Sequence, residues 1–127
     1  MPSALNLLKE RGLFAQCSDE KELDELLQRE SVSLYCGFDP TGPSLTVGHL
    51  VPVMAMAHLQ KLGHRPVALI GGGTCRIGDP TGKSQLRQML SPEQIDDHSK
   101  RFRRQLSRFL DFSEGKARMV DNADWLL

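Results

Sequence analysis

The sequence predicts an α/β domain in which helices flank a parallel sheet. Two short apolar runs, at residues 32–38 and 65–72, have the composition of buried strands. The residues between them carry an apolar pattern of helical length that ends at Gly63. A strand, a helix and a strand within about 40 residues form a βαβ unit, whose two strands are parallel. A chain of 127 residues has room for one such domain.

Two amphipathic helices are expected before the first strand. Leucines from Leu5 onward indicate a short helix that ends at Gly12. A second helix begins after Asp19, which can cap the first turn with Glu22 at the third position, and leucines follow at helical spacing. Both helices are expected to be packing elements.

The helix between the two strands is expected to begin between Thr46 and Gly48. Pro52 sets this start, because proline is tolerated in the first turn of a helix, where amide hydrogens have no partner within the helix. Gly63 occupies the position after the helix, where a left-handed residue is common.

A glycine-rich segment at residues 72–85 follows the second strand and is expected to be a loop. Ser91, Pro92 and Gln94 then form a capping box with proline at the first helical position, so a long helix should run to about Leu110. Its apolar stripe comprises Ile95, Phe102, Leu106, Phe109 and Leu110, and its basic residues are Lys100, Arg101, Arg103, Arg104 and Arg108. The last residues, NADWLL, suggest the beginning of a further apolar element and therefore a fragment.

The composition limits the possible partners. Lys plus Arg and Asp plus Glu number 16 each, so no overall field attracts nucleic acid or an acidic membrane surface, and any anion must bind locally. Cys17, Cys36 and Cys75 are far apart and form no CxxC pair, which argues against a zinc site or a disulfide framework. No apolar run approaches the roughly 18 residues of a membrane span. We expect a soluble, cytoplasmic protein without a membrane or DNA partner.

The first candidate site is the segment that follows the first strand. Ligands of parallel α/β sheets lie beyond the carboxyl ends of the strands. This segment ends at the start of a helix, whose free amide hydrogens and positive dipole end favour a phosphate. Gly48 has no side chain to keep a ligand from that backbone, and His49 and Thr41 are candidate donors beside the anion. His49 could instead only cap or pack the helix.

The glycine-rich segment resembles two phosphate-binding motifs but fits neither. Three residues separate Gly78 from Gly82, whereas a P-loop requires four. A dinucleotide fingerprint that starts at Gly71 would require a glycine where the chain has Arg76. Neither label applies.

The same segment still offers groups that could bind a ligand. Residues 71–73 form a glycine floor that would admit a flat or bulky ligand, with Thr74 and Asp79 at its edge. Asp79 could pair with an ammonium group or only fix its own turn. Lys83 and Arg87 could close over phosphates or remain solvated surface cations.

Four motifs, in order, resemble the N-terminal half of the catalytic domain of the bacterial tyrosyl-tRNA synthetases. They are YCGFDPTGPSLTVGHL, GHRPVALIGGGT, IGDPTGK, and FLDF followed by NADW. The resemblance implies the Rossmann-like nucleotide-binding fold of class I synthetases. It implies an N-terminal helical segment, residues 1–30, that packs on the catalytic domain, and the first half of that domain at residues 31–127. The rest of the catalytic domain and the anticodon-binding region would be absent.

The resemblance implies a tyrosine–tRNA ligase. Such an enzyme joins tyrosine to the α-phosphate of ATP, releases pyrophosphate and transfers the tyrosyl group to tRNA(Tyr). ATP with Mg²⁺ would be a substrate, and no tightly bound cofactor or protein-bound metal is implied. The full-length protein would be a homodimer, and the 127-residue chain alone would be weakly active or inactive.

The resemblance also implies roles for matching residues. Tyr35 would bind the substrate phenol, and Thr74 with Asp79 would hold its ammonium group. The adenylate would lie along Cys36, Gly37, Asp39, Gly48 and His49. The residues that would act on the phosphates in catalysis are His49, Thr41, Thr46, Lys83 and Arg87.

Three places depart from the family pattern. Cys75-Arg76 stands where many relatives have a glycine and an apolar residue. Thr46 stands where the signature His-x-Gly-His has its first histidine, and threonine is shorter and never cationic. Pro52 stands where relatives can carry an ATP-contacting side chain, and proline offers only van der Waals contact.

Two other functions fit the same sequence. The missing first histidine and the basic face of the long helix are compatible with a non-catalytic nucleotide- or RNA-binding module. An ATP-dependent ligase of the same fold with another amino acid as substrate is the third possibility, if Tyr35 does not recognise the substrate.

Overall fold

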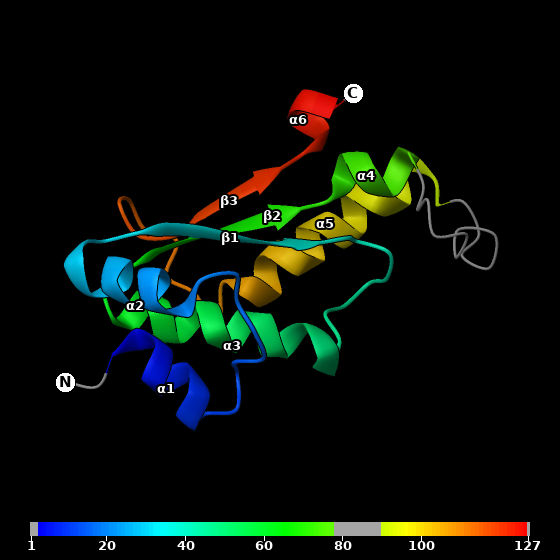
Figure 1. Ribbon diagram of the computed structural model, residues 1–127. Coiled ribbons are helices and arrows are strands. Elements are labelled where there is room, and N and C mark those ends of the chain that lie inside the picture. Colours follow the sequence, from blue (N-terminus) through cyan, green and yellow to red (C-terminus); the bar gives the residue numbers. More distant parts are fainter. Residues whose placement is uncertain (1–2, 78–89, 127) are drawn as a thin grey trace.

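The computed structural model describes residues 3–77 and 90–126 (Figure 1). In chain order its helices and strands are α1 (Ala4–Glu10), α2 (Glu20–Arg29), β1 (Ser33–Phe38), α3 (Val47–Lys61), β2 (Arg65–Ile70), α4 (Gly72–Ile77), α5 (Pro92–Leu106), β3 (Arg118–Asp121) and α6 (Ala123–Leu126). Within these residues no helix has the length and apolar character needed to cross a membrane.

The strands form a parallel sheet in the order β1-β2-β3. The pairing brings Phe38 opposite Ile70 and Ile70 opposite Asp121. The carboxyl ends of the three strands therefore lie in line at one edge of the sheet. Helix α3 connects β1 to β2, which confirms the predicted βαβ unit.

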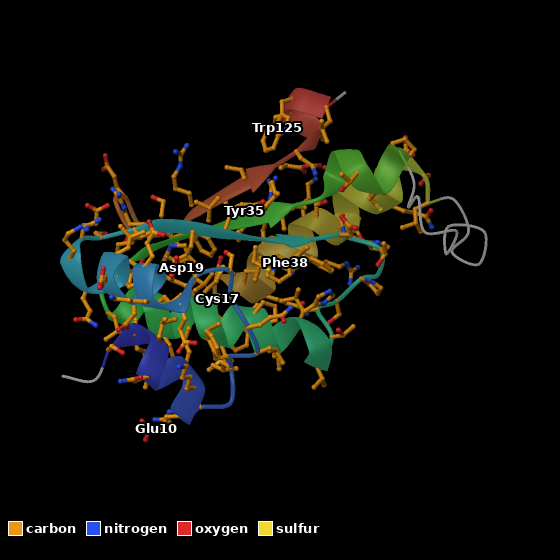
Figure 2. All side chains as sticks on the ribbon, viewed as in Figure 1. Glu10, Cys17, Asp19, Tyr35, Phe38 and Trp125 are labelled. Carbon is orange, nitrogen blue, oxygen red and sulfur yellow. The ribbon has the colours of Figure 1, made fainter. Side chains whose placement is uncertain are left out.

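Helices α3 and α5 cover one face of this sheet (Figure 1). The core between them and the strands contains Phe38, Val53, Met56, Ala68, Ile70, Phe102, Leu106 and Leu110. Burial alternates along β1, so that Leu34 and Cys36 pack against the core while Tyr35 and Gly37 are exposed on the opposite face. In Figure 2, Tyr35 and Phe38 accordingly lie on opposite sides of the sheet.

A second apolar cluster joins the N-terminal helices to α3. Leu5 and Leu8 of α1 are buried together with Leu59 of α3. Leu23 and Leu27 of α2 pack against the same cluster. Burial of these leucines therefore packs the two N-terminal helices against α3.

The predicted caps of α2 and α5 and the predicted glycines after α1 and α3 are confirmed. Asp19 accepts a hydrogen bond from the amide of the third residue of α2 at 3.0 Å. Ser91 and Gln94 form the reciprocal capping box of α5, with distances of 2.9 and 3.1 Å. Gly12 and Gly63 follow their helices with φ angles of +72° and +97°, a left-handed conformation that favours glycine.

Pro52 does not lie in the first turn of α3, so this part of the prediction is wrong. The helix begins at Val47, within the predicted range, and Pro52 is therefore in its second turn. Proline has no amide hydrogen to donate to the carbonyl of Gly48, four residues earlier. The position of the helix start is right, although the reason given for it is not.

The second half of the chain differs from the prediction in three respects. Residues 72–77 of the predicted loop form helix α4. Helix α5 ends at Leu106, before the predicted Leu110, and Phe109 is 40% exposed rather than part of the buried stripe. Strand β3 and helix α6 were not predicted. The three elements that were missed, α4, β3 and α6, have only four to six residues, so their local patterns carry little information.

Stability should depend on the protonation of His64. This residue is buried, and its Nδ1 accepts a hydrogen bond from the amide of Val32 at 3.2 Å. Burial lowers the pKa of His64 below the ordinary 6.5, because the interior disfavours the charged imidazolium. The unfolded chain therefore binds a proton at higher pH than the folded chain. The free energy of unfolding should be highest above pH 6.5 and fall as the pH drops below this value.

Urea denaturation between about pH 5 and 8 would measure this dependence. His64→Asn keeps an acceptor for the amide of Val32 and cannot titrate. We expect its stability to change less over this range than that of the unmodified chain. Equal slopes for the two proteins would show that another group causes the dependence.

Candidate functional site

Side chains that follow the three strands meet at the carboxyl edge of the sheet. Asp39 follows β1, Thr74 lies in α4 after β2, and Asn122 follows β3. The Thr74 hydroxyl donates to Asp39 Oδ1 at 2.9 Å, and Asn122 Nδ2 donates to Thr74 Oγ1 at 3.3 Å. The two segments that the sequence places at this edge therefore touch there through Asp39 and Thr74.

Residues at the end of β3 hold the start of α4. Asn122 is buried, and its Oδ1 accepts hydrogen bonds from the amides of Gly73 at 2.7 Å and Thr74 at 3.3 Å. Asp121 Oδ1 accepts from the amide of Gly72 at 3.2 Å. The orphan amides at the start of this helix are thus satisfied from a neighbouring strand. This role of Asn122 was not predicted from the sequence, where the residue stood out only as part of the NADW motif, although an Asp-Asn pair after an apolar run could have suggested it.

The glycines that follow β2 do not form an open floor for a ligand, so this expectation is wrong. A Cβ atom on Gly71 would lie 2.0 Å from Asp39 Oδ1, and one on Gly72 would lie 2.4 Å from Asp121 Oδ1. A Cβ atom on Gly73 would lie 3.1 Å from the backbone nitrogen of Ala123. The glycines therefore leave room for the protein's own residues at the ends of β1 and β3.

His49 lies in the first turn of α3, where its ring borders the apolar core. Its Nδ1 accepts a hydrogen bond from the amide of Thr46 at 3.0 Å, and Thr46 Oγ1 lies 3.3 Å from the same nitrogen. The ring meets Phe38 and Phe102 edge-on, with centroids 5.8 and 5.7 Å apart. His49 therefore caps and packs the helix. Because Nδ1 accepts, a neutral ring carries its proton on Nε2, which remains a donor.

The backbone at the start of α3 is accessible. Gly48 is exposed, and a Cβ atom there would meet only Thr46 Oγ1, at 3.6 Å. Thr41 and Thr46 are exposed as well. A 15-residue helix presents unpaired amides and the positive end of its dipole at this point. This end of α3 can accommodate an anion without a change in the chain.

Two neighbouring residues of β1 differ in their surroundings. Tyr35 is 72% exposed on the open face of the sheet, where its phenol is free to meet a ligand. Cys36 packs against the core, and burial raises the pKa of its thiol, so the thiol stays protonated at neutral pH. Asp79, Lys83 and Arg87, three of the predicted site residues, lie outside the described residues.

Ion pairs reduce the positive charge on α5. They join Lys100 to Asp96 at 3.2 Å, Arg101 to Asp97 at 3.0 Å, and Arg103 to Asp121 at 3.7 Å. Exposed pairs of this kind add little stability, but they lower the potential that a phosphate backbone would feel. The basic face of this helix is therefore a weak basis for an RNA-binding module.

The chain is similar in sequence to curated bacterial ligases. It is 54% identical over 125 residues to the tyrosine–tRNA ligase of Caldanaerobacter subterraneus subsp. tengcongensis, and this covers 98% of the chain and 31% of that protein. It is 55% identical over 127 residues to the tyrosine–tRNA ligase of Acetivibrio thermocellus, which covers 100% of the chain and 31% of that protein. The chain spans about a third of the length of these relatives.

Solved structures and a family-level comparison agree with this similarity. A C-terminally truncated mitochondrial tyrosyl-tRNA synthetase of Coccidioides posadasii matches with a TM-score of 0.81 and 31% identity, over 98% of this chain and 36% of that one. The corresponding Aspergillus nidulans structure matches with a TM-score of 0.83 and 29% identity, over 98% and 39%. The sequence model of the family "tRNA synthetases class I (W and Y)" matches residues 27–127. The predicted Rossmann-like fold is thereby confirmed, and the chain belongs to the class I tRNA synthetases of this W and Y family.

Proposed function

We propose that the protein carrying this chain is a tyrosine–tRNA ligase, which activates tyrosine with ATP and transfers it to tRNA(Tyr). Residues 1–30 would be a helical segment that packs on the catalytic domain, and residues 31–127 would be the first half of that domain. One observation carries the proposal. Thr74, whose hydroxyl is held by Asp39, and the exposed start of α3, which suits a phosphate, follow strands that end at the same sheet edge.

The tyrosine would lie over the open face of the sheet. Tyr35 projects from this face and can exchange a hydrogen bond with a phenol. Thr74, at the carboxyl edge, would hold the ammonium group together with Asp79, and Asp39 fixes the Thr74 hydroxyl. A site that pairs with a phenol discriminates against phenylalanine, because its polar group would be left without a partner.

The nucleotide would lie at the start of α3. Gly48 allows the adenosine to approach the helix backbone, and His49 offers Nε2–H while its other nitrogen stays bonded to Thr46. Cys36, Gly37 and Asp39 would line the adenylate along the end of β1. Donors fixed along a phosphate chain stabilise the charge that develops in phosphoryl-centre substitution.

The phosphates would meet hydroxyl and cationic groups. These are Thr41, Thr46, Lys83 and Arg87. ATP would arrive with Mg²⁺ as a substrate, and the remaining partners would be tRNA(Tyr) and a second subunit in a cytoplasmic homodimer.

Gly48→Ala tests whether the nucleotide lies at this helix start. The nearest atom to the new methyl group is 3.6 Å away, an ordinary contact, so the fold should accept it. Alanine in a helix is favoured over glycine by up to about 1 kcal/mol, so the chain should become slightly more stable to urea. ATP should nevertheless bind more weakly, because the methyl group would meet the adenosine, and we expect the KM for ATP to rise about tenfold or more.

The assay is exchange of labelled pyrophosphate into ATP by the full-length protein that carries the chain. Exchange should require tyrosine, and the KM for tyrosine should change little in the variant. Exchange that proceeds only with another amino acid would contradict the proposed specificity. An unchanged KM for ATP in Gly48→Ala would place the nucleotide elsewhere.

A further inference from the structure

Helix α5 holds the segment that connects β1 to α3 at both of its ends. His98 Nδ1 lies 3.0 Å from the carbonyl oxygen of Pro40, which can only accept, so this nitrogen carries the proton. Gln105 Oε1 accepts a hydrogen bond from the amide of Leu45 at 2.7 Å, and its Nε2 donates to Ser44 Oγ at 3.0 Å. The side-chain amide of Gln105 thus bonds to this segment at two points, one backbone amide and one side-chain hydroxyl.

The two anchors lie on one face of a rigid element. His98 and Gln105 are seven residues apart, two helical turns, and both side chains are half-buried. Phe102, between them, is 1% exposed in the core and touches the ring of His49. The face of α5 that anchors the segment is therefore fixed by the same core that supports the start of α3.

This segment carries groups that the proposed function requires. Thr41 follows the anchored Pro40, and Thr46 follows the anchored Leu45. Thr46 in turn donates its amide to His49 Nδ1. A shift of Leu45 would therefore move the cap of α3 and the imidazole with it. Displacements of about 1 Å in a catalytic site can reduce rates strongly.

We propose that Gln105 is a positioning residue that places Thr41, Thr46 and His49 for the nucleotide phosphates, with His98 as the second anchor. This inference rests on the proposed function. Gln105 acts through its bonds to Ser44 and Leu45, so its loss should raise the KM for ATP and leave the binding of tyrosine largely unaffected. The hydrogen bonds of Gln105 go to Ser44 and Leu45, whereas Tyr35 is on β1 and Thr74 is on α4.

The test compares Gln105→Ala with Gln105→Glu in the full-length protein. In the alanine variant we expect the KM for ATP to rise about tenfold with a lower kcat, and the KM for tyrosine to stay within about twofold. Glutamate keeps an acceptor for the amide of Leu45 and loses only the bond to Ser44. This variant should recover most of the lost activity.

Gln60 provides a matched control. Its side-chain amide also makes two hydrogen bonds to a distant segment, donating to the carbonyl of Asp111 at 2.8 Å and accepting from its amide at 3.0 Å. It lies 14 residues after Thr46, roughly 20 Å along α3. Gln60→Ala should lower stability without raising the KM for ATP. If both alanine variants change the kinetics in the same way, Gln105 has only a structural role and the inference is wrong.

His98 offers a second variant should Gln105→Ala fail to fold. Asparagine can place an N–H group where Nδ1 lies, so His98→Asn should retain exchange activity while His98→Ala raises the KM for ATP. Amide hydrogen exchange adds a readout that needs no activity, because the Leu45 amide should exchange faster in Gln105→Ala than in Gln105→Glu.

The outcomes separate the two proposals. Active protein with an unchanged KM for ATP in Gln105→Ala and His98→Ala overturns the positioning role and leaves the ligase function intact. An unmodified protein without tyrosine-dependent exchange overturns the ligase function and with it the role in ATP binding. Unchanged exchange of the Leu45 amide would refute the anchoring in either case.

Discussion

Replacement of Phe102 by alanine is expected to lower the free energy of unfolding by about 3–5 kcal/mol. Phe102 is 1% exposed and belongs to the core between α5, α3 and the sheet. Its removal leaves a cavity that the packed strands and helices can fill only in part. The ring of His49 also loses one of its two aromatic neighbours.

Urea denaturation of the 127-residue chain, followed by far-ultraviolet circular dichroism, would measure this loss. Phe109→Ala is the matched control, because Phe109 has the same side chain but is 40% exposed just beyond the end of α5. We expect it to cost less than half as much. Similar losses for the two variants would mean that α5 is not seated on the sheet as described.

Gly71→Ala is expected to destabilise the chain by about 1–3 kcal/mol and to break the contact between Asp39 and Thr74. The added Cβ atom would lie 2.0 Å from Asp39 Oδ1 and 2.6 Å from Thr74 Oγ1, so at least one of these side chains must move. Backbone strain is not the cause, because Gly71 is not among the glycines with positive φ. In the full-length protein the KM for tyrosine should rise, since Thr74 would lose its fixed position.

A double-mutant cycle with Asp39→Ala isolates the cause. Without the Asp39 carboxylate the new methyl group has more space, so Gly71→Ala should cost clearly less stability in that background. Equal costs in both backgrounds would show that the overlap with Asp39 does not determine the effect. Pyrophosphate exchange at varied tyrosine concentration would measure the KM for tyrosine in the same variants of the full-length protein.

Features that depend on nearby residues were predictable from the sequence. Asp19, Ser91 and Gln94 make their capping bonds within three positions, and the start of α3 lies within the predicted range. The parallel arrangement of β1 and β2 followed from the helix between them, and it placed Asp39 and Thr74 at one edge.

Features that depend on distant residues were not predictable. In the sequence, the glycines after β2 suggest open space for a ligand. In the structure, this space is occupied by Asp121 and Asn122, which lie 49 positions beyond Gly72 and Gly73 and could not be connected to them from the sequence. Gln105 gave no signal in the sequence, since its partners Ser44 and Leu45 are 61 and 60 positions away. A single sequence carries no direct record of such pairings.

The hydrogen bonds from α4 to Asn122 affect the order in which parts of the polypeptide can fold during synthesis. The amides of Gly73 and Thr74 receive their acceptor only from a residue beyond β3. A nascent polypeptide still on the ribosome can complete the β1–α3–β2 unit early, but it must extend past residue 122 before this turn of helix is secured. The start of α4, which carries the Thr74 proposed to bind the amino acid, would thus be secured only after β3 has been synthesised.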